Sequence, residues 1–398
     1  MARSPGSLES LRRLNRSRVL GVLQLRGAAS QADIVRETGL SRTTVSSLVA
    51  ELIQEGAVVE PSEPARHAPS PNGGRPPTLL TLDPSSGGFV GVDFGHEDIR
   101  VAVVDRAGDL LIDARKEMDV DNHAQDALDA VVEMVPTLIA EAGVERARAI
   151  GAGVAVSAPI HTDSGFASQV IFPTWAGIDV REVLCSRLGM PVYVGNDANL
   201  GALAEATFGA GRGVHHILYV MLSAGVGAGL FLDSSLYEGE SGIAGELGHT
   251  VVRPDGQVCR CGNRGCLETV AGVAALTGAL SQSHGALSLD DVIGLVRSGD
   301  PGAVRVVTDA GAAVGQALAG ACSVLDPGLV VVGGEVAATG EPLLRSIQAS
   351  LDRMTSPAMG RSYPVALGVL GAKAEALGAA ALAMSHASTE IFDGVGVA

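Results

Sequence analysis

The stretch Phe89-Val-Gly-Val-Asp-Phe-Gly95 decides the fold, because an apolar strand there runs directly into a glycine turn. A second glycine-rich turn, Ser223-Ala-Gly-Val-Gly-Ala-Gly229, lies between two further expected strands, Ile217–Leu222 and Ala228–Leu232. Two similar halves, each opening with paired strands around such a turn, predict duplicated lobes around a cleft. Glycine turns let backbone N–H groups approach a phosphate, although any tight hairpin also needs them.

Strands and helices alternate on both sides of these turns, which is typical of an α/β protein. The other expected elements of this region are strands over Ile99–Val104, Ala149–Val156 and Leu329–Val332 and helices over Asp126–Ala142 and Leu200–Thr207. We expect three units: a head of residues 1–82, a lobe I of residues 88–197 closed by a C-terminal helix over 372–386, and a lobe II of residues 198–371.

The charge of the chain is divided unevenly. The formal net charge is −16, which alone argues against a nucleic-acid partner, because a polyanion would be repelled. The first 82 residues nevertheless carry ten arginines, no lysine and seven acids, a formal charge of +3, so the remainder carries −19. A small basic head therefore precedes a large acidic body, and the head is the part suited to DNA.

The head has the pattern of a winged helix-turn-helix. Helices are expected over Leu8–Leu25, Gln31–Thr38 and Arg42–Glu55, with Ser30 and Ser41 as N-caps of the second and third. Two short strands flank a proline-rich loop, so residues 57–82 form the wing.

The third helix exposes small hydroxyls and one arginine at its N-terminal end, and these approach base edges and phosphates without steric cost. The predicted contacts to double-stranded DNA are Gln31, Ser41, Arg42, Thr43, Thr44, Ser46 and Ser47, with Arg75 in the wing. The alternative is a three-helix bundle that packs on the body and binds protein.

No apolar run approaches the roughly 20 residues that cross a bilayer, and no signal-peptide pattern follows the N-terminal arginines. We therefore expect a cytoplasmic protein with no membrane partner, in which thiols stay reduced. Cys185 and Cys322 lie alone in apolar contexts and are expected in the core.

The other three cysteines lie in one loop. His249, Cys259, Cys261 and Cys266 fall within eighteen residues, with glycines between the thiols, and this set fits a tetrahedral Zn²⁺ site. Four protein ligands leave no open position, so the metal is expected to be structural. The alternative is a reduced loop without metal.

Carboxylates and an amide gather near this loop. Glu246 and Glu268 flank it, and Asn196-Asp197 ends an expected strand. Such groups suit the hydroxyls of a sugar, and an aspartate there is also able to take a proton from a hydroxyl that attacks ATP. The alternative is that Asp197 caps the following helix and that the glutamates are solvated.

Over nearly its whole length the chain resembles the ROK family of repressors, open reading frames and sugar kinases. The matching stretches are Gly151-Ala-Gly-Val-Ala-Val156, Gly195-Asn-Asp-Ala-Asn-Leu-Gly-Ala-Leu-Ala-Glu205, Gly239-Glu-Ser-Gly-Ile-Ala-Gly-Glu-Leu-Gly-His249, the loop Cys259-Arg-Cys-Gly-Asn-Arg-Gly-Cys-Leu-Glu268, and Asp326-Pro with the Val-Val-Val-Gly-Gly that follows.

The resemblance implies an actin-like, hexokinase-type fold of two lobes. It implies a sugar cleft touched by Asn196, Asp197, Glu246, His249 and Glu268, and zinc on His249, Cys259, Cys261 and Cys266. The winged head followed by Gly74-Arg-Pro-Pro77 resembles the family's transcriptional regulators and not its stand-alone kinases.

The departures from the family pattern concern ATP and the sugar. The kinases carry Asp-x-Gly-Gly-Thr-Lys at the first phosphate loop, where this chain reads Asp93-Phe-Gly-His-Glu-Asp98. His96 replaces a glycine, and Glu97 and Asp98 would each repel a phosphate about 4 Å away by roughly 4 kcal/mol. The second loop has Ala224 in place of the kinase Gly-Thr-Gly. Ser157-Ala-Pro159 stands where many members have Pro-Gly or Gly-Gly beside the sugar.

We therefore expect a sugar-responsive transcriptional regulator, in most cases a repressor, with a degenerate, non-catalytic kinase body in which Asp197 is a vestigial base. A homodimer or homotetramer would match a palindromic operator. The alternatives are an ATP-dependent sugar kinase with a DNA-binding head, which would show turnover, and a protein-binding scaffold, which would show no salt-dependent operator binding.

Overall fold

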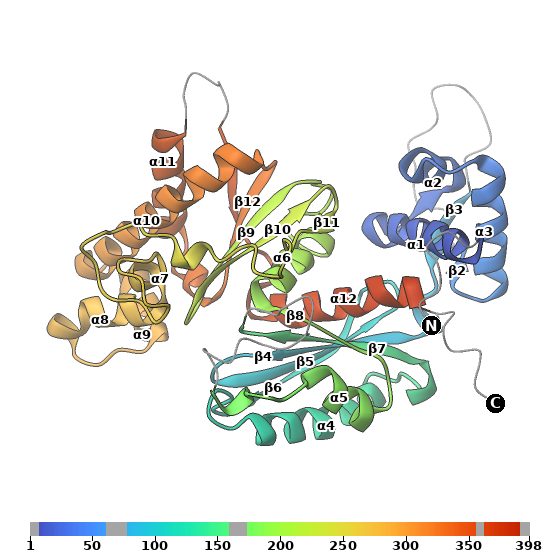
Figure 1. Cartoon of the computed structure of the whole chain (residues 1–398), viewed down its shortest axis with the longest axis horizontal. Helices are drawn as coiled ribbons and strands as arrows, with labels where there is room; N and C mark the ends of the chain where they lie inside the picture. Colours follow the sequence, from blue (N-terminus) through green and yellow to red (C-terminus); the bar gives the residue numbers. More distant parts are fainter. Residues whose placement is uncertain (1–7, 61–77, 159–172, 356–361, 391–398) are drawn as a thin grey trace.

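Three bodies of secondary structure follow one another along the chain (Figure 1). The structure is a computed structural model that describes residues 8–60, 78–158, 173–355 and 362–390. The predicted α/β architecture is confirmed, with one small sheet in the head and one five-stranded sheet in each lobe.

The head consists of three helices and a three-stranded sheet. Its elements are α1 (Leu8–Arg26), β1 (Ala29–Ser30), α2 (Gln31–Thr38), α3 (Arg42–Gln54), β2 (Val58–Val59) and β3 (Leu79–Leu82). Ser30 caps α2 through a capping box and Ser41 caps α3, as the sequence predicted. Strand β1 was not predicted, because two residues are too few to show an alternating pattern; it pairs with β3 in the order β1-β3-β2.

Lobe I is a mixed sheet in the order β6-β5-β4-β7-β8. A short 3-10 turn, η1 (Pro84–Ser86), precedes it. Its elements are β4 (Gly88–Phe94), β5 (Asp98–Asp105), β6 (Leu110–Glu117), α4 (Ala124–Glu141), β7 (Ala149–Val156), α5 (Val180–Leu188) and β8 (Val192–Asn196). Helices α4 and α5 cover one face and bury a core of apolar side chains there (Figure 1).

Lobe II repeats this order as β11-β10-β9-β12-β13, with the first three strands antiparallel and the last two parallel to β9. Its strands are β9 (Ile217–Leu222), β10 (Val226–Leu232), β11 (Ser235–Leu236), β12 (Leu329–Gly333) and β13 (Val365–Leu367). Its helices are α7 (Glu268–Ala271), α8 (Val273–His284), α9 (Leu289–Ser298), α10 (Pro301–Leu325) and α11 (Glu341–Met354). The shared strand order confirms the expected duplication.

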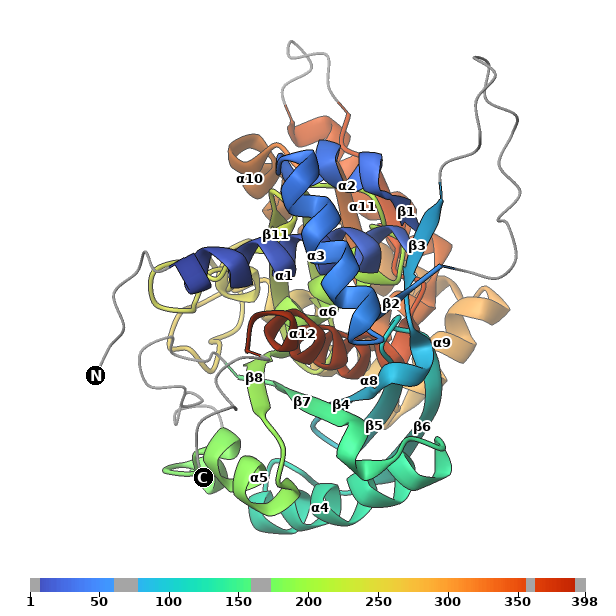
Figure 2. The same cartoon turned by 90° about the vertical axis from the view of Figure 1, so that its right-hand side faces the viewer.

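Helices α6 (Asp197–Thr207) and α12 (Ala374–Glu390) lie between the two sheets, and α12 also packs against α1 of the head (Figures 1 and 2). Glycines permit the close contact of α12 with lobe I. A Cβ at Gly91 would lie 1.8 Å from the carbonyl oxygen of Ala376, and one at Gly153 would lie 1.7 Å from that of Ala379. No larger residue fits at either position, so the glycines of β4 and β7 fix the position of α12.

The two isolated cysteines differ in their surroundings. Cys322 is buried on α10, as predicted, but Cys185 is exposed, so the prediction of a core position for Cys185 was wrong. Helix α5 turns Val180, Leu184 and Leu188 inward, and the next residue after Leu184 points about 100° away from that face. Within the described ranges, no helix is both long and apolar enough to cross a membrane.

Candidate effector cleft, metal centre and DNA-binding face

The end of β8 and the start of α6 present Asn196 and Asp197. Asn196 is the N-cap, because its Oδ1 accepts a hydrogen bond from the N–H of Asn199 at 3.2 Å. Its Nδ2 donates to Asp197 Oδ1 at 2.9 Å. Asp197 is therefore the first residue of the helix and not its cap, and its carboxylate also accepts the N–H of Ala198 at 2.7 Å.

Burial raises the pKa of Asp197, which is only 7% exposed, while hydrogen bonds from Ser157 and Ala198 oppose this effect. The hydroxyl of Ser157 also lies 3.3 Å from the carbonyl oxygen of Phe94. Ser157 therefore connects β4 to Asp197. A buried carboxylate with a raised pKa is suited both to binding a hydroxyl and to accepting its proton.

Two further acids, which the sequence analysis missed, lie within electrostatic range of Asp197. Burial and then the charge of Glu375 hold the pKa of Asp93 well above its usual range, and Asp197 adds to this effect. Burial raises the pKa of Glu375 to about 7, and Asp197 and Glu335 contribute. Glu375 lies on α12, far along the chain, so no local motif connects it with the cleft.

Glu246 and Glu268 lie in lobe II. About 40% of the Glu246 side chain is exposed, yet burial of its carboxyl raises its pKa; His249 opposes this, while Asp197 and Glu268 add to it. Glu268 Oε1 accepts from Arg260 Nε at 3.0 Å, and Oε2 accepts from the N–H of Val226 at 3.3 Å. Glu246 therefore lies within electrostatic range of both Asp197 and Glu268.

The four predicted metal ligands converge. The donor atoms of His249, Cys259, Cys261 and Cys266 all lie within 4.8 Å of one another. Cys261 Sγ and Cys266 Sγ are 3.7 Å apart, and Cys259 Sγ is 3.6 Å from His249 Nδ1. Zn–S bonds of about 2.3 Å in a tetrahedron give S···S separations of roughly 3.8 Å, so the donor set fits a tetrahedral metal ion.

The outer surroundings of this centre also fit a metal. His249 turns Nδ1 toward the thiols, and Glu246 Oε2 lies 3.6 Å from its Nε2, on the side of the ring where a carboxylate supports a ligating imidazole in metal sites. Gly265 adopts a left-handed φ of 71°, and a Cβ there would lie 1.5 Å from the carbonyl oxygen of Arg253. Glycine is thus required for the loop to bring Cys266 inward.

His96 and Asp98, at the first glycine turn of residues 95–98, have partners that the sequence expectation did not include. His96 Nδ1 lies 2.9 and 3.0 Å from the two carboxylate oxygens of Asp121. Burial lowers the pKa of His96, but the contact with Asp121 and the charge of Asp197 together raise the pKa above its usual value. Glu97 is exposed, whereas Asp98 forms an ion pair with Arg115. The expected repulsion of phosphate by Asp98 therefore needs correction, because Arg115 offsets its charge.

At the second loop, the turn that includes Ala224 joins β9 to β10. The hydroxyl of Ser223 donates to Glu335 Oε2 at 3.0 Å. This hydrogen bond places the Glu335 carboxylate beside the second glycine loop. The kinases of the family that this chain resembles are expected to bind phosphate at that loop. Glu335 follows Gly334, directly after β12, but nothing in its local sequence connects it with Ser223.

The predicted DNA-binding residues on α2 and α3 lie on the surface. Gln31, Ser41, Arg42, Thr43, Ser46 and Ser47 are exposed, and Thr44 is half-buried. Ser41 Oγ accepts the N–H of Thr44 at 3.1 Å and lies 2.8 Å from the hydroxyls of Thr43 and Thr44. Arg75 lies outside the described residues.

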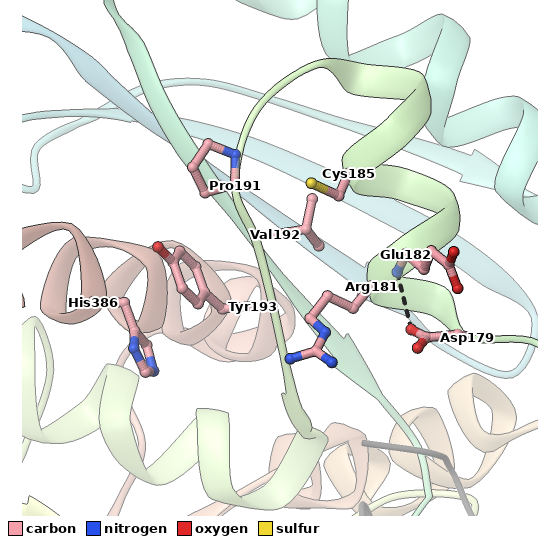
Figure 3. Close-up of a pocket in the computed structure, with 8 residues that line it drawn as sticks. All are labelled: Asp179, Arg181, Glu182, Cys185, Pro191, Val192, Tyr193 and His386. Atoms are coloured by element: carbon pink, nitrogen blue, oxygen red, sulfur yellow. Dashed lines mark hydrogen bonds between the residues drawn. The ribbon is translucent and has the colours of Figure 1, made fainter. Parts of the chain in front are cut away.

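A hollow of about 540 Å³ lies elsewhere, between α5, β8 and α12 (Figure 3). Tyr193 stacks on His386 with ring centroids 4.4 Å apart, and the exposed Cys185 lines the same hollow. The predicted effector-binding residues are absent from its lining. This hollow is therefore separate from the predicted effector-binding residues.

Comparisons with known proteins agree with this architecture. The model of the ROK family matches residues 89–386, and that of the MarR family matches residues 13–68. The chain is 28% identical over 379 residues to the xylose repressor of Bacillus subtilis (strain 168), covering 94% of this chain and 96% of that protein.

Two further similarities are to a glucokinase and to a solved structure. The chain is 31% identical over 310 residues to the glucokinase of Thermotoga maritima, covering 74% of this chain and 96% of that protein. The crystal structure of a ROK family transcriptional regulator, a homologue of the E. coli Mlc protein, superposes with a TM-score of 0.76 over 96% of this chain and 97% of that chain at 23% identity, which shows a likeness of fold.

Proposed function

Because the chain belongs to the ROK family, we propose that it is a sugar-responsive, DNA-binding transcriptional repressor whose kinase-like body has become a sensor. The observation that carries this proposal is the exposed N-terminal face of α3, with Arg42, Thr43 and Ser46, on a winged head. The near full-length similarity to a xylose repressor supports it.

We assign DNA binding to the head, residues 1–82, with contacts from Gln31, Ser41, Arg42, Thr43, Thr44, Ser46, Ser47 and Arg75. The sugar or sugar derivative binds between lobe I (88–197, with 372–386) and lobe II (198–371), held by Asn196, Asp197, Glu246, His249 and Glu268. The protein acts as a homodimer or homotetramer, because two-fold symmetry matches a palindromic operator.

A structural Zn²⁺ is bound by His249, Cys259, Cys261 and Cys266. The ion supplies no chemistry to a reaction, since its four protein ligands complete the tetrahedron. It holds the loop that bears Glu268, whose carboxylate contacts Arg260 and the N–H of Val226.

We further propose that the body does not phosphorylate sugars. His96 stands where the family's kinases have a glycine, and Glu335 places a carboxylate beside the second loop. Both features oppose a bound triphosphate, the first by bulk and the second by charge.

One observation favours a second candidate, an ATP-dependent sugar kinase with a DNA-binding head. Asp197 is buried, has a raised pKa and is available as a base. A coupled assay with ATP–Mg²⁺ and common hexoses separates the two candidates: sustained turnover refutes the non-catalytic body, and its absence leaves sensing as the role of the cleft.

DNA binding is tested by selecting duplexes from a random pool with the full chain and measuring affinity for the selected duplex. Arg42→Ala is expected to weaken binding roughly tenfold and to reduce its salt dependence. Arg187→Ala is the matched control, because Arg187 pairs with Asp129 in lobe I. Equal affinities for the Arg42 variant and the control would move the contact surface away from α3.

A further inference from the structure

The turn between β5 and β6, residues 105–109, is a rigid contact of the body with the head. Asp105 is only 6% exposed, and its Oδ1 accepts the N–H groups of Ala107 at 2.8 Å and Asp109 at 2.9 Å. Gly108 has a φ of 95°, which a side chain would strain, and its N–H donates to the carbonyl oxygen of Asp105 at 3.1 Å. The turn therefore has little freedom to change shape by itself.

One side of this turn faces the head. Ala107 packs against the head's hydrophobic core. Arg106 is half-buried, and its pKa is lowered by burial and by the neighbouring charge of Arg16, while Glu55 and Asp83 oppose this. Arg106 thus lies within electrostatic range of residues from α1, from the C-cap of α3 and from the segment after β3.

Within the head, those charges connect the first helix to the third. Arg16 is 4% exposed, and its Nη1 donates to Glu55 Oε1 at 2.9 Å. Glu55 is the C-cap residue of α3, the helix whose N-terminal end carries the proposed DNA contacts. The Arg16–Glu55 pair therefore joins α1 to the end of α3, next to the turn whose Ala107 packs on the head.

The other side of the turn faces the body. A Cβ at Gly108 would lie 2.5 Å from Cε1 of Phe208 and 3.3 Å from Cε of Met384. Phe208 is the C-cap residue of α6, and Met384 lies in α12. The turn is therefore in contact with both interlobe helices.

Three elements that meet at this turn have their other ends near the cleft. Strand β5 begins at Asp98 beside the first phosphate loop, helix α6 begins at Asp197, and α12 carries Glu375 in its first turn. Both helices lie between the sheets, and α12 extends as far as α1 of the head (Figures 1 and 2). A shift of either helix therefore moves residues that contact the turn of residues 105–109.

We propose that the turn of residues 105–109 couples the cleft to the head, and that Arg106 is a positioning residue that sets α3 through Arg16 and Glu55. This inference rests on the proposed function, because it assumes that the head binds DNA in response to a sugar. Such coupling requires that the sugar stabilise one arrangement of these contacts over another.

The test compares the full chain with Arg106→Gln, Glu55→Gln and the double variant on the in vitro selected duplex. Arg148→Gln is the matched control, because Arg148 is also a lobe I arginine near the head and donates to the carbonyl oxygen of Ser85 at 3.1 Å. Operator affinity is measured with and without D-xylose or D-glucose at millimolar concentration, whichever raises the thermal midpoint of the wild type.

Arg106→Gln is expected to bring the ratio of operator affinities with and without sugar close to one while the sugar-induced thermal shift is retained. By linkage, the operator then also loses its effect on sugar affinity. A ratio unchanged from the wild type, or one reduced equally by Arg148→Gln, overturns the proposal. A purely structural role would lower the thermal midpoint without changing the ratio.

The second readout needs no sugar. Without sugar, the Arg106→Gln, Glu55→Gln double variant is expected to depart from the product of the single fold-changes in operator affinity by about threefold or more. If the fold-change of the double variant equals the product of the two single fold-changes, the proposed role of Arg106 is wrong. If the wild type binds no duplex, the proposed function is wrong. The proposed function is also wrong if the wild type binds the duplex but responds to neither sugar, while the two substitutions still depend on each other.

Discussion

The hydroxyl of Tyr219 donates a hydrogen bond to Glu375 Oε1 at 3.4 Å, which joins strand β9 of lobe II to helix α12. Burial of this pair raises the pKa of Glu375 to about 7, and the charges of Asp197 and Glu335 add to the effect. The contact places an acid that titrates near neutrality between the two sheets.

The first prediction concerns pH and stability. A carboxyl whose pKa is raised in the folded state binds more protons there than in the unfolded state. Its contribution to the free energy of unfolding is therefore fully present below about pH 4.5 and is lost as the pH rises through about 7. Glu375→Gln is therefore expected to raise the thermal midpoint at pH 8 and to change it little near pH 4.5. Differential scanning calorimetry measures this, with the exposed Glu341→Gln as control. An equal effect of Glu375→Gln at both pH values contradicts the prediction.

The second prediction concerns the metal. Cys259→Ser removes a buried thiol from the four-ligand set and is expected to reduce bound zinc from about one ion per chain to near zero and to lower the thermal midpoint. Elemental analysis of the purified chain measures the bound zinc, and a thermal melt measures the midpoint. Cys185→Ser, at an exposed thiol outside the set, should change neither quantity. Full zinc content in Cys259→Ser would disprove the assignment.

The third prediction concerns the packing of α12. Gly153→Ala puts a Cβ 1.7 Å from a backbone oxygen of α12, so it should destabilise the fold by about 1–3 kcal/mol or more. Gly278→Ala, on an exposed face of α8 with open space around it, should instead stabilise by roughly 0.5–1 kcal/mol. Denaturant unfolding distinguishes the opposite signs, and two similar small effects would contradict the close contact.

The fourth prediction concerns effector binding. Asp197→Asn keeps the shape of the side chain but removes a charged acceptor, which is worth about 1.5–3 kcal/mol and corresponds to roughly a 10- to 150-fold loss of sugar affinity. Isothermal titration with the sugar that stabilises the wild type measures this. Asp129→Asn, on the outer face of lobe I, is the control. Unchanged sugar affinity in the Asp197 variant would exclude Asp197 from the binding set.

Local patterns were sufficient to predict much of this architecture. The caps Ser30 and Ser41, the strand ending at Asn196 and the spacing of the three cysteines each depend on neighbours within one element or loop. The expected duplication also held, because both glycine turns join strands of equivalent position in the two sheets.

The remainder depends on contacts between distant segments. Glu375 reaches Asp197 only through the packing of α12, and Asp93 does so through the alignment of β4, β7 and β8. Asp98 loses its expected repulsion because Arg115 on the neighbouring strand pairs with it. The contact of Gly108 with Phe208 and Met384 likewise joins three segments that no local pattern relates.

We propose that one chain binds DNA through α3 and adjusts that binding to a sugar held near Asp197. Fluorescence anisotropy of the in vitro selected duplex, titrated with the full chain with and without sugar, tests it most directly. We expect salt-dependent binding of the duplex that is weaker in the presence of the sugar that stabilises the chain. In Asp197→Asn, we expect binding of the duplex to be insensitive to that sugar. Operator affinity identical with and without every sugar that binds the chain would contradict it.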